Sequence, residues 1–253
     1  MARRLWEVDG ARGFALGLML LYNWSFALRF LDVWTIAPPD DWFYWWLFPR
    51  FIGFLFVFIA GVSLTLSVNR LRRSDPGRWR EIARRKYPMR GLRVFAVGLA
   101  ITVATFVLYP DRFVYFGVLH LIGFSIVASV PVLTRRWTAL GLAAALVAAT
   151  VVVGDVEVNS RLLGAIGFDA GVPTLDHFPI VPWAGVALLG VWTGHTLFPR
   201  GERRVPLGDL DGRRALSALL APLQFVGRHT LVIYLAHQPA LGLVLLLLGY
   251  DVL

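Results

Sequence analysis

Three polar residues lie inside apolar stretches of the sequence: Asn23, His120 and His237. Polar groups in a membrane cost free energy unless they face partners or water, so these residues mark a candidate functional site. A histidine titrates near neutral pH, which suits a general base that deprotonates an amine or hydroxyl nucleophile. The alternative for all three is structural, namely hydrogen bonds that hold neighbouring helices together.

His120 stands in VYFGVLHLIGFS, with Gly117 and Gly123 three residues to either side. Glycines at this spacing let a neighbouring helix approach closely. His237 stands in RHTLVIYLAHQPALG and is followed by Gln238 and by Pro239, which kinks a helix. The two histidines either line one cavity with Asn23 or serve as separate packing residues.

Asp176 directly precedes His177, just before the apolar run that begins near residue 180. A carboxylate here could orient a histidine or bind a cationic substrate. It could also cap the helix that follows.

Asp9, Arg12 and Asn23 share one face of the first expected helix, and Asp9 and Arg12 can pair at a spacing of three residues. Arg12, Arg90 and Arg93 fall on the expected inner side, where guanidinium groups could hold coenzyme phosphates. For most of the basic residues on that side a simpler interpretation is membrane topology and contact with anionic lipid.

The elements that position these residues are membrane helices. Hydrophobic residues make up 57% of the 253 residues and charged residues only 16%, more apolar surface than one soluble core could bury. A helix needs roughly 20 apolar residues to cross a bilayer. This predicts an all-α, polytopic helix bundle in a single domain, residues 1–253, with about seven transmembrane helices. The expected spans are 14–34, 47–68, 93–110, 113–133, 137–154, 180–198 and 230–249.

The positive charges predict the orientation, because basic loops stay on the cytoplasmic side. All of the 25 Lys and Arg residues fall on one side of seven spans except Arg29, Arg50, Arg112 and Arg161. We therefore expect a cytoplasmic N-terminus, an outer C-terminus and a multi-pass protein of the plasma membrane. In such a protein the net charge of +9 reports topology, and no nucleic-acid partner is expected.

Two stretches do not fit simple spans. Residues 35–46, TIAPPDDWFYWW, combine turn formers with aromatic residues typical of the outer headgroup level. Residues 215–228, ALSALLAPLQFVGR, predict an interfacial or re-entrant helix interrupted by Pro222.

Several function classes lack their signatures. The chain has no cysteine and five histidines, so no metal site is expected. HExxH, GxxxxGK[ST], GxSxG and a Rossmann glycine motif are all missing, as are acidic residues in mid-span that proton-coupled transport would need.

Six segments in order resemble the membrane domain of the heparan-alpha-glucosaminide N-acetyltransferase family, especially its short prokaryotic members. They are RLWEVDGARGFALGLMLLYN, FLFVFIAGVSLTLS, KYPMRGLRVFAVGLAITVAT, YFGVLHLIGFSIVAS, LDHFPIVPWAGVALLGVWTG and FVGRHTLVIYLAHQPAL.

This resemblance implies a transmembrane acyltransferase that carries an acetyl or other acyl group from cytosolic acyl-CoA to a polar acceptor on the far side. Asn23 matches a functional asparagine of the opening span. The family's histidine between the first two spans has no counterpart in residues 35–46. His120, in the Gly-Val-Leu-His motif of the short members, is expected to replace it as the base. Attack would be direct, because no Cys or activated Ser is evident for a covalent intermediate.

The partners expected are membrane lipids, acetyl-CoA or another acyl-CoA as co-substrate, and a sugar, glycolipid or other small polar acceptor. The sequence leaves open whether the chain forms a homo-oligomer. The alternative function is a non-enzymatic membrane carrier or binding protein for a lipid or small solute, using the same polar cavity.

Overall fold

The computed structural model describes residues 5–154, 156–204 and 214–250. In these residues the regular secondary structure is helical, with two isolated β-bridges and no strand. Part of residues 200–228, whose basic side chains all fall on the expected inner side, lies outside the described residues. The chain divides into two compact units, Met1–Phe56 with Leu207–Leu253, and Val57–Pro206. The predicted all-α class is confirmed.

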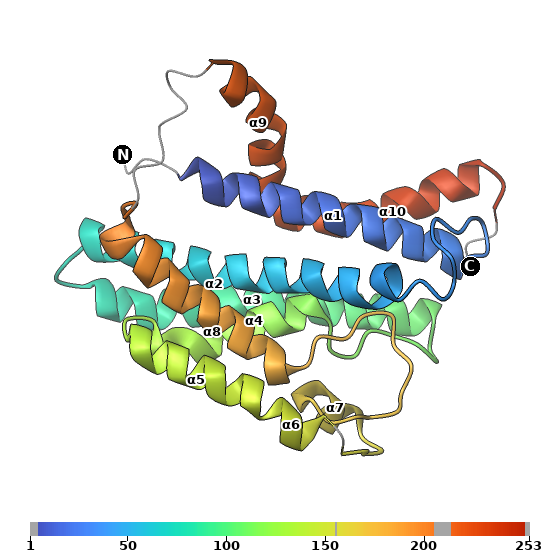
Figure 1. Ribbon diagram of the computed structural model, residues 1–253, viewed down its shortest axis with the longest axis horizontal. Helices are drawn as coiled ribbons and strands as arrows, with labels where there is room; N and C mark the ends of the chain where they lie inside the picture. Colours follow the sequence, from blue (N-terminus) through green and yellow to red (C-terminus); the bar gives the residue numbers. More distant parts are fainter. Residues whose placement is uncertain (1–4, 155, 205–213, 251–253) are drawn as a thin grey trace. The chain divides into compact units, whose positions relative to one another are not determined.

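The first unit joins the two ends of the chain. It contains α1 (Trp6–Phe30), η1 (Phe43–Leu47), the first nine residues of α2 (Phe48–Ser74), α9 (Arg214–Arg228) and α10 (Thr230–Leu247). Glu7 and Asp9 lie in the first turn of α1, where acidic side chains complement the helix dipole. Both α9 and α10 pack along α1 (Figure 1). Leu16, Met19 and Ile52 form the buried centre of this packing.

A glycine sets the closest contact in the first unit. A Cβ atom added at Gly13 of α1 would lie 1.9 Å from the carbonyl oxygen of Leu223 in α9, closer than any real contact. Only glycine therefore permits this approach of the two helices.

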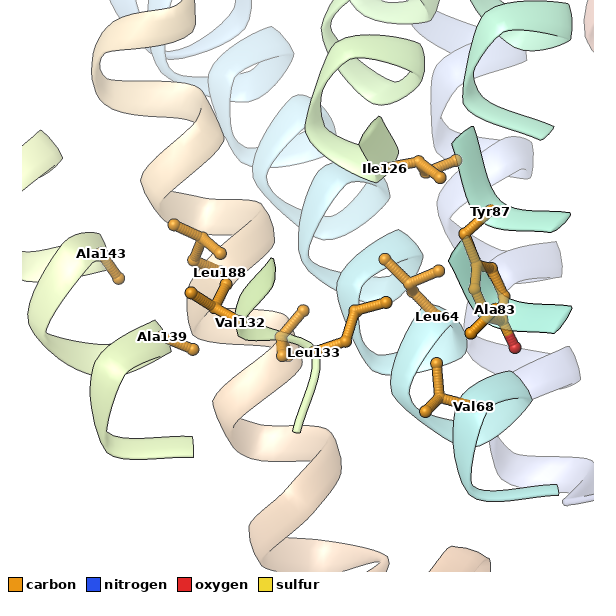
Figure 2. Packing of buried hydrophobic residues seen from close by; sticks show 11 residues of the cluster. Leu64, Val68, Ala83, Tyr87, Ile126, Val132, Leu133, Ala139, Ala143 and Leu188 are labelled. Carbon is orange, nitrogen blue, oxygen red and sulfur yellow. The ribbon is translucent and has the colours of Figure 1, made fainter. Parts of the chain in front are cut away.

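The second unit holds the rest of α2 and the middle of the chain. Its elements are α3 (Trp79–Leu108), α4 (Val118–Ser129), η2 (Val130–Val132), α5 (Arg136–Ala148), α6 (Thr150–Val153), α7 (Arg161–Ile166), α8 (Ile180–Leu197) and η3 (Pro199–Gly201). Residues from α2, α3, α4, η2, α5 and α8 build one buried apolar cluster, in which the Tyr87 side chain is fully buried (Figure 2).

Five helices are long and apolar enough to cross a membrane among the described residues: Phe43–Ser74, Trp79–Leu108, Arg136–Val153, Ile180–Leu197 and Thr230–Leu247. They coincide with five of the seven expected spans. The other two expected spans fall on α1, which interrupts its apolar sequence with Asn23 and Arg29, and on the short apolar stretch Val118–Val132. The count of seven and the orientation of the termini therefore stay predictions.

The two stretches that did not fit simple spans contain helix in part. Residues 43–47 form a π-helix that is continuous with α2, and the turn residues before it end at Asp40. The expected amphipathic helix at 215–228 exists as α9, with Pro222 inside it. Its location at a membrane interface stays a prediction.

Candidate functional site

Asn23 and His237 meet in the first unit, although 214 residues separate them in the sequence. Asn23 Nδ2 lies 3.3 Å from His237 Nε2, which links α1 to α10. The His237 side chain is buried, with 6% of its surface exposed, and Asn23 is half-buried. Asn23 and His237 are therefore in direct contact, which the sequence had left open, and His120 belongs to the other compact unit.

The hydrogen bond made by Nδ1 of His237 decides which ring nitrogen carries the proton. His237 Nδ1 bonds the carbonyl oxygen of Tyr234, one turn earlier in α10. A carbonyl only accepts, so Nδ1 carries the proton and the neutral ring has its lone pair at Nε2. The Asn23 amide therefore donates to Nε2, and this nitrogen is the basic atom of the pair.

Arg12 is held at the other end of α1 by a carboxylate. Its Nη1 lies 3.1 Å from Asp9 Oδ1, which confirms the expected pair. Arg228 of α9 approaches the second oxygen, with Nε 3.6 Å from Asp9 Oδ2. Asp9 is thus a buried carboxylate between two guanidinium groups that the close packing of α1 and α9 brings together.

His120 belongs to the second unit and is enclosed, with 1% of its surface exposed. Its Nδ1 accepts the backbone N–H of Gly117 at 3.2 Å, so Nε2 carries the proton and faces Thr102 Oγ1 at 3.3 Å. Thr102 in turn donates to the carbonyl oxygen of Val114 at 2.7 Å. Both ring nitrogens are therefore bound within the protein.

Of the two glycines that flank His120, only Gly123 has a neighbouring helix close to it. At Gly123 an added Cβ would lie 2.6 Å from the backbone nitrogen of Phe95, so α3 approaches α4 as closely as the sequence predicts. At Gly117 the close neighbour is a side chain instead, Oδ2 of Asp176 at 2.2 Å. A helix does not pass there.

Asp176 caps a helix, but not the one that follows it. Its Oδ2 accepts the N–H of Val118 at 3.0 Å, in the first turn of α4, whereas α8 begins after Pro179 without a side-chain cap. Burial of the carboxyl raises the pKa of Asp176 to about 6, and the hydrogen bond from Val118 opposes this shift. Asp176 and His120 thus bind consecutive backbone N–H groups, those of Val118 and Gly117.

His177 turns away from this cap. Its Nε2 lies 3.0 Å from Tyr115 Oη and 3.1 Å from the carbonyl oxygen of Gly164. Burial lowers the pKa of His177, and the hydrogen bond to Gly164 partly offsets the effect. His177 therefore links its own segment to those of Tyr115 and Gly164.

Arg90 and Arg93 are exposed side chains of α3 in the second unit. Neither forms an ion pair with a carboxylate in the part of the chain that the structure describes. No cluster of three His, Asp or Glu side chains that could bind a metal ion occurs among the described residues either.

Sequence reasoning did not identify two partners of the histidines. The Tyr234 carbonyl is a backbone group, which no residue pattern marks. Thr102 lies 18 residues before His120, and only its place one turn after Gly98, where the α3 backbone passes the imidazole, could have indicated it.

The comparisons agree with the resemblance seen in the sequence. A family model described as "Heparan-alpha-glucosaminide N-acetyltransferase, catalytic" matches residues 4–239, nearly the whole chain. No curated protein and no solved structure matches the chain. The match runs through both compact units and includes every candidate site residue. Together with the apolar helices it indicates a membrane acetyltransferase, and the chain belongs to the heparan-alpha-glucosaminide N-acetyltransferase catalytic family.

Proposed function

We propose that the protein transfers an acetyl or other acyl group from cytosolic acyl-CoA to a polar acceptor, a sugar, glycolipid or other amine or hydroxyl compound, at the outer face of the plasma membrane. The observation that carries the proposal is the Asn23–His237 pair, in which the basic nitrogen of a neutral histidine faces a side-chain amide. Membership in a catalytic family favours this enzyme over a carrier of lipids or solutes.

His237 acts as the general base. Its Nε2 takes the proton from the acceptor as the acceptor attacks the thioester carbon, and the Tyr234 carbonyl stabilises the Nδ1–H of the imidazolium that forms. The new bond joins acceptor and acyl group, the carbon–sulfur bond breaks, and the thiolate of coenzyme A leaves and is protonated. His120 suits this role less well, because its basic nitrogen, Nδ1, is held by a backbone N–H, whereas the basic nitrogen of His237 faces a side-chain amide.

Asn23 contributes a hydrogen-bond donor. Once His237 turns to the acceptor, the amide N–H of Asn23 is released from Nε2 and can donate to the thioester oxygen as negative charge develops there. The half-buried, largely apolar surroundings strengthen such a bond, since little water competes.

Arg12 is the proposed phosphate ligand on the same unit. It precedes Asn23 by 11 residues, roughly 16 Å along α1. Arg90 and Arg93 are proposed as further phosphate ligands because they are exposed cations without a described carboxylate partner. Chemical roles for His120 and Asp176 stay predictions.

The test is release of coenzyme A from acetyl-CoA by the purified protein in lipid nanodiscs, with glucosamine as the probe acceptor. The chain has no cysteine, so a thiol reagent reports the product without background from the protein. His237→Gln should lower turnover by at least about 100-fold, and Asn23→Ala by a similar factor. His229→Gln is the matched control, an exposed histidine one residue before α10.

Wild-type turnover in His237→Gln would overturn the assignment of the base. If His120→Gln abolished turnover in a folded protein while His237→Gln did not, the base would be His120.

A further inference from the structure

A cation on the surface of α2 lies among apolar side chains. Arg50 is exposed in the first turn of α2, and Phe43, Leu47, Phe51 and Phe54 around it are exposed as well. Residues 43, 47, 50 and 54 recur every three or four positions, so they share one face of the continuous helix from η1 into α2. An arginine on an apolar face of a candidate membrane span needs a polar partner.

The guanidinium of Arg50 is held toward the start of the helix. Its Nη1 donates to the carbonyl oxygen of Trp46 at 2.9 Å, and its central carbon lies 4.0 Å from the centre of the Trp46 ring. Both contacts direct the charge away from the middle of the span, as expected of an arginine that reaches from hydrocarbon to the headgroup region.

Beside this charge lies an aromatic surface. The rings of Trp42 and Trp46 stack with their centres 4.9 Å apart and an interplanar angle of 19°. Trp42 leaves 59% of its surface exposed and Trp46 leaves 44%. Exposed tryptophans of this kind prefer the boundary between lipid headgroups and acyl chains.

Arg50 lacks a carboxylate partner among the residues that the structure describes. Although Asp32, Asp40 and Asp41 lie nearby in the sequence, no carboxylate of the described residues forms an ion pair with Arg50. A guanidinium binds phosphate with strong charge-assisted hydrogen bonds, and its planar fork matches two phosphate oxygens.

We propose that the face formed by Phe43, Leu47, Arg50, Phe51 and Phe54 is a phospholipid site. Arg50 binds the lipid phosphate, the stacked Trp42 and Trp46 contact the headgroup, and the apolar side chains pack against one acyl chain. The site serves to hold α2 at a fixed depth in its leaflet. It does not depend on acyl transfer, and lipid binding and turnover are measured separately.

The test is native mass spectrometry of the delipidated protein titrated with phosphatidylglycerol. Arg50→Gln should weaken binding at this site by about tenfold or more, the loss expected for a charge-assisted hydrogen bond. Trp46→Leu, which removes the ring that positions the guanidinium, should weaken it as well. Arg161→Gln is the matched control, because Arg161 is also exposed and stacks on an aromatic ring, with its central carbon 4.9 Å from the centre of Phe113.

Two probes separate the parts of the ligand. Diacylglycerol with the same acyl chains but no phosphate should not compete, and glycerol 3-phosphate, which has the phosphate but no chains, should not displace the lipid. Equal affinity of wild type and Arg50→Gln would overturn the proposal, as would competition by diacylglycerol. Displacement by glycerol 3-phosphate would also overturn it, in favour of a site for a soluble anion.

Discussion

Replacing Asp176 by asparagine tests how the buried cap of α4 responds to pH. The asparagine oxygen can still accept the N–H of Val118, but the charge is removed. Burial raises the pKa of this carboxyl from 3.8 to about 6. Because the folded pKa lies above the unfolded one, the folded state binds the proton more tightly, and stability is lost as pH rises from about 4 to 6.

The size of the effect follows from the same two pKa values. Above pH 7 the ionised carboxyl lowers the stability of the wild type by about 3 kcal/mol, because the pKa differs between 3.8 and about 6 and each pKa unit is worth about 1.4 kcal/mol. At pH 4.5 the same linkage lowers the stability of the wild type by only about 1 kcal/mol. Asp176→Asn should therefore be more stable than wild type at pH 8, and this advantage should shrink as the solution is acidified.

The assay is thermal unfolding in detergent, followed by tryptophan fluorescence at one fixed scan rate from pH 4.5 to pH 8. At pH 8 we expect Asp176→Asn to melt roughly 6–12 °C higher than wild type, from about 2–4 °C per kcal/mol for a chain of this size. Asp176→Ala, which also removes the acceptor, should gain about 1 kcal/mol less. A lower melting temperature of Asp176→Asn at pH 8 would refute the reasoning, because the charge would then stabilise α4 by more than its burial costs.

Two further predictions concern packing. Gly13→Ala should lose about 2–3 kcal/mol of stability, because its Cβ would meet the carbonyl of Leu223, whereas Gly17→Ala on the open face of α1 should unfold at or above the wild-type temperature. Equal melting temperatures would contradict the close approach of α1 and α9. His120→Ala should lose about 2–4 kcal/mol because it leaves a cavity and removes the acceptor of the Gly117 N–H, but turnover per folded molecule should be kept. Lost turnover in folded His120→Ala would return this histidine to the reaction.

The sequence predicted best what depends on neighbours along the chain. Five expected spans coincide with apolar helices because hydropathy is a local property. The pair of Asp9 and Arg12 was predictable since residues three apart share a helix face. The π-helix at residues 43–47 was not, because aromatic residues fit both a turn region and a helix.

The candidate site depended on contacts that the sequence does not encode locally. Asn23 and His237 were each identified as polar residues in apolar runs, but their contact depends on how α1 and α10 are rotated about their axes. His120 was identified in the same way, but the identity of a residue does not reveal its partners, here Gly117 and Thr102, which bind the two ring nitrogens. Asp176 precedes one helix and caps another, since the fold brings residues 176 and 118 together.

The two bonds of His237 differ in what would break them. The bond to Tyr234 lies within a single turn of α10, so it moves with that helix as one body. The bond to Asn23 joins two helices, and a small rotation of α10 against α1 is enough to break it. Such a rotation would uncover Nε2 while the tautomer stays as it is. Sliding or turning of these helices would therefore switch the basic nitrogen between a covered and an available state without moving a proton.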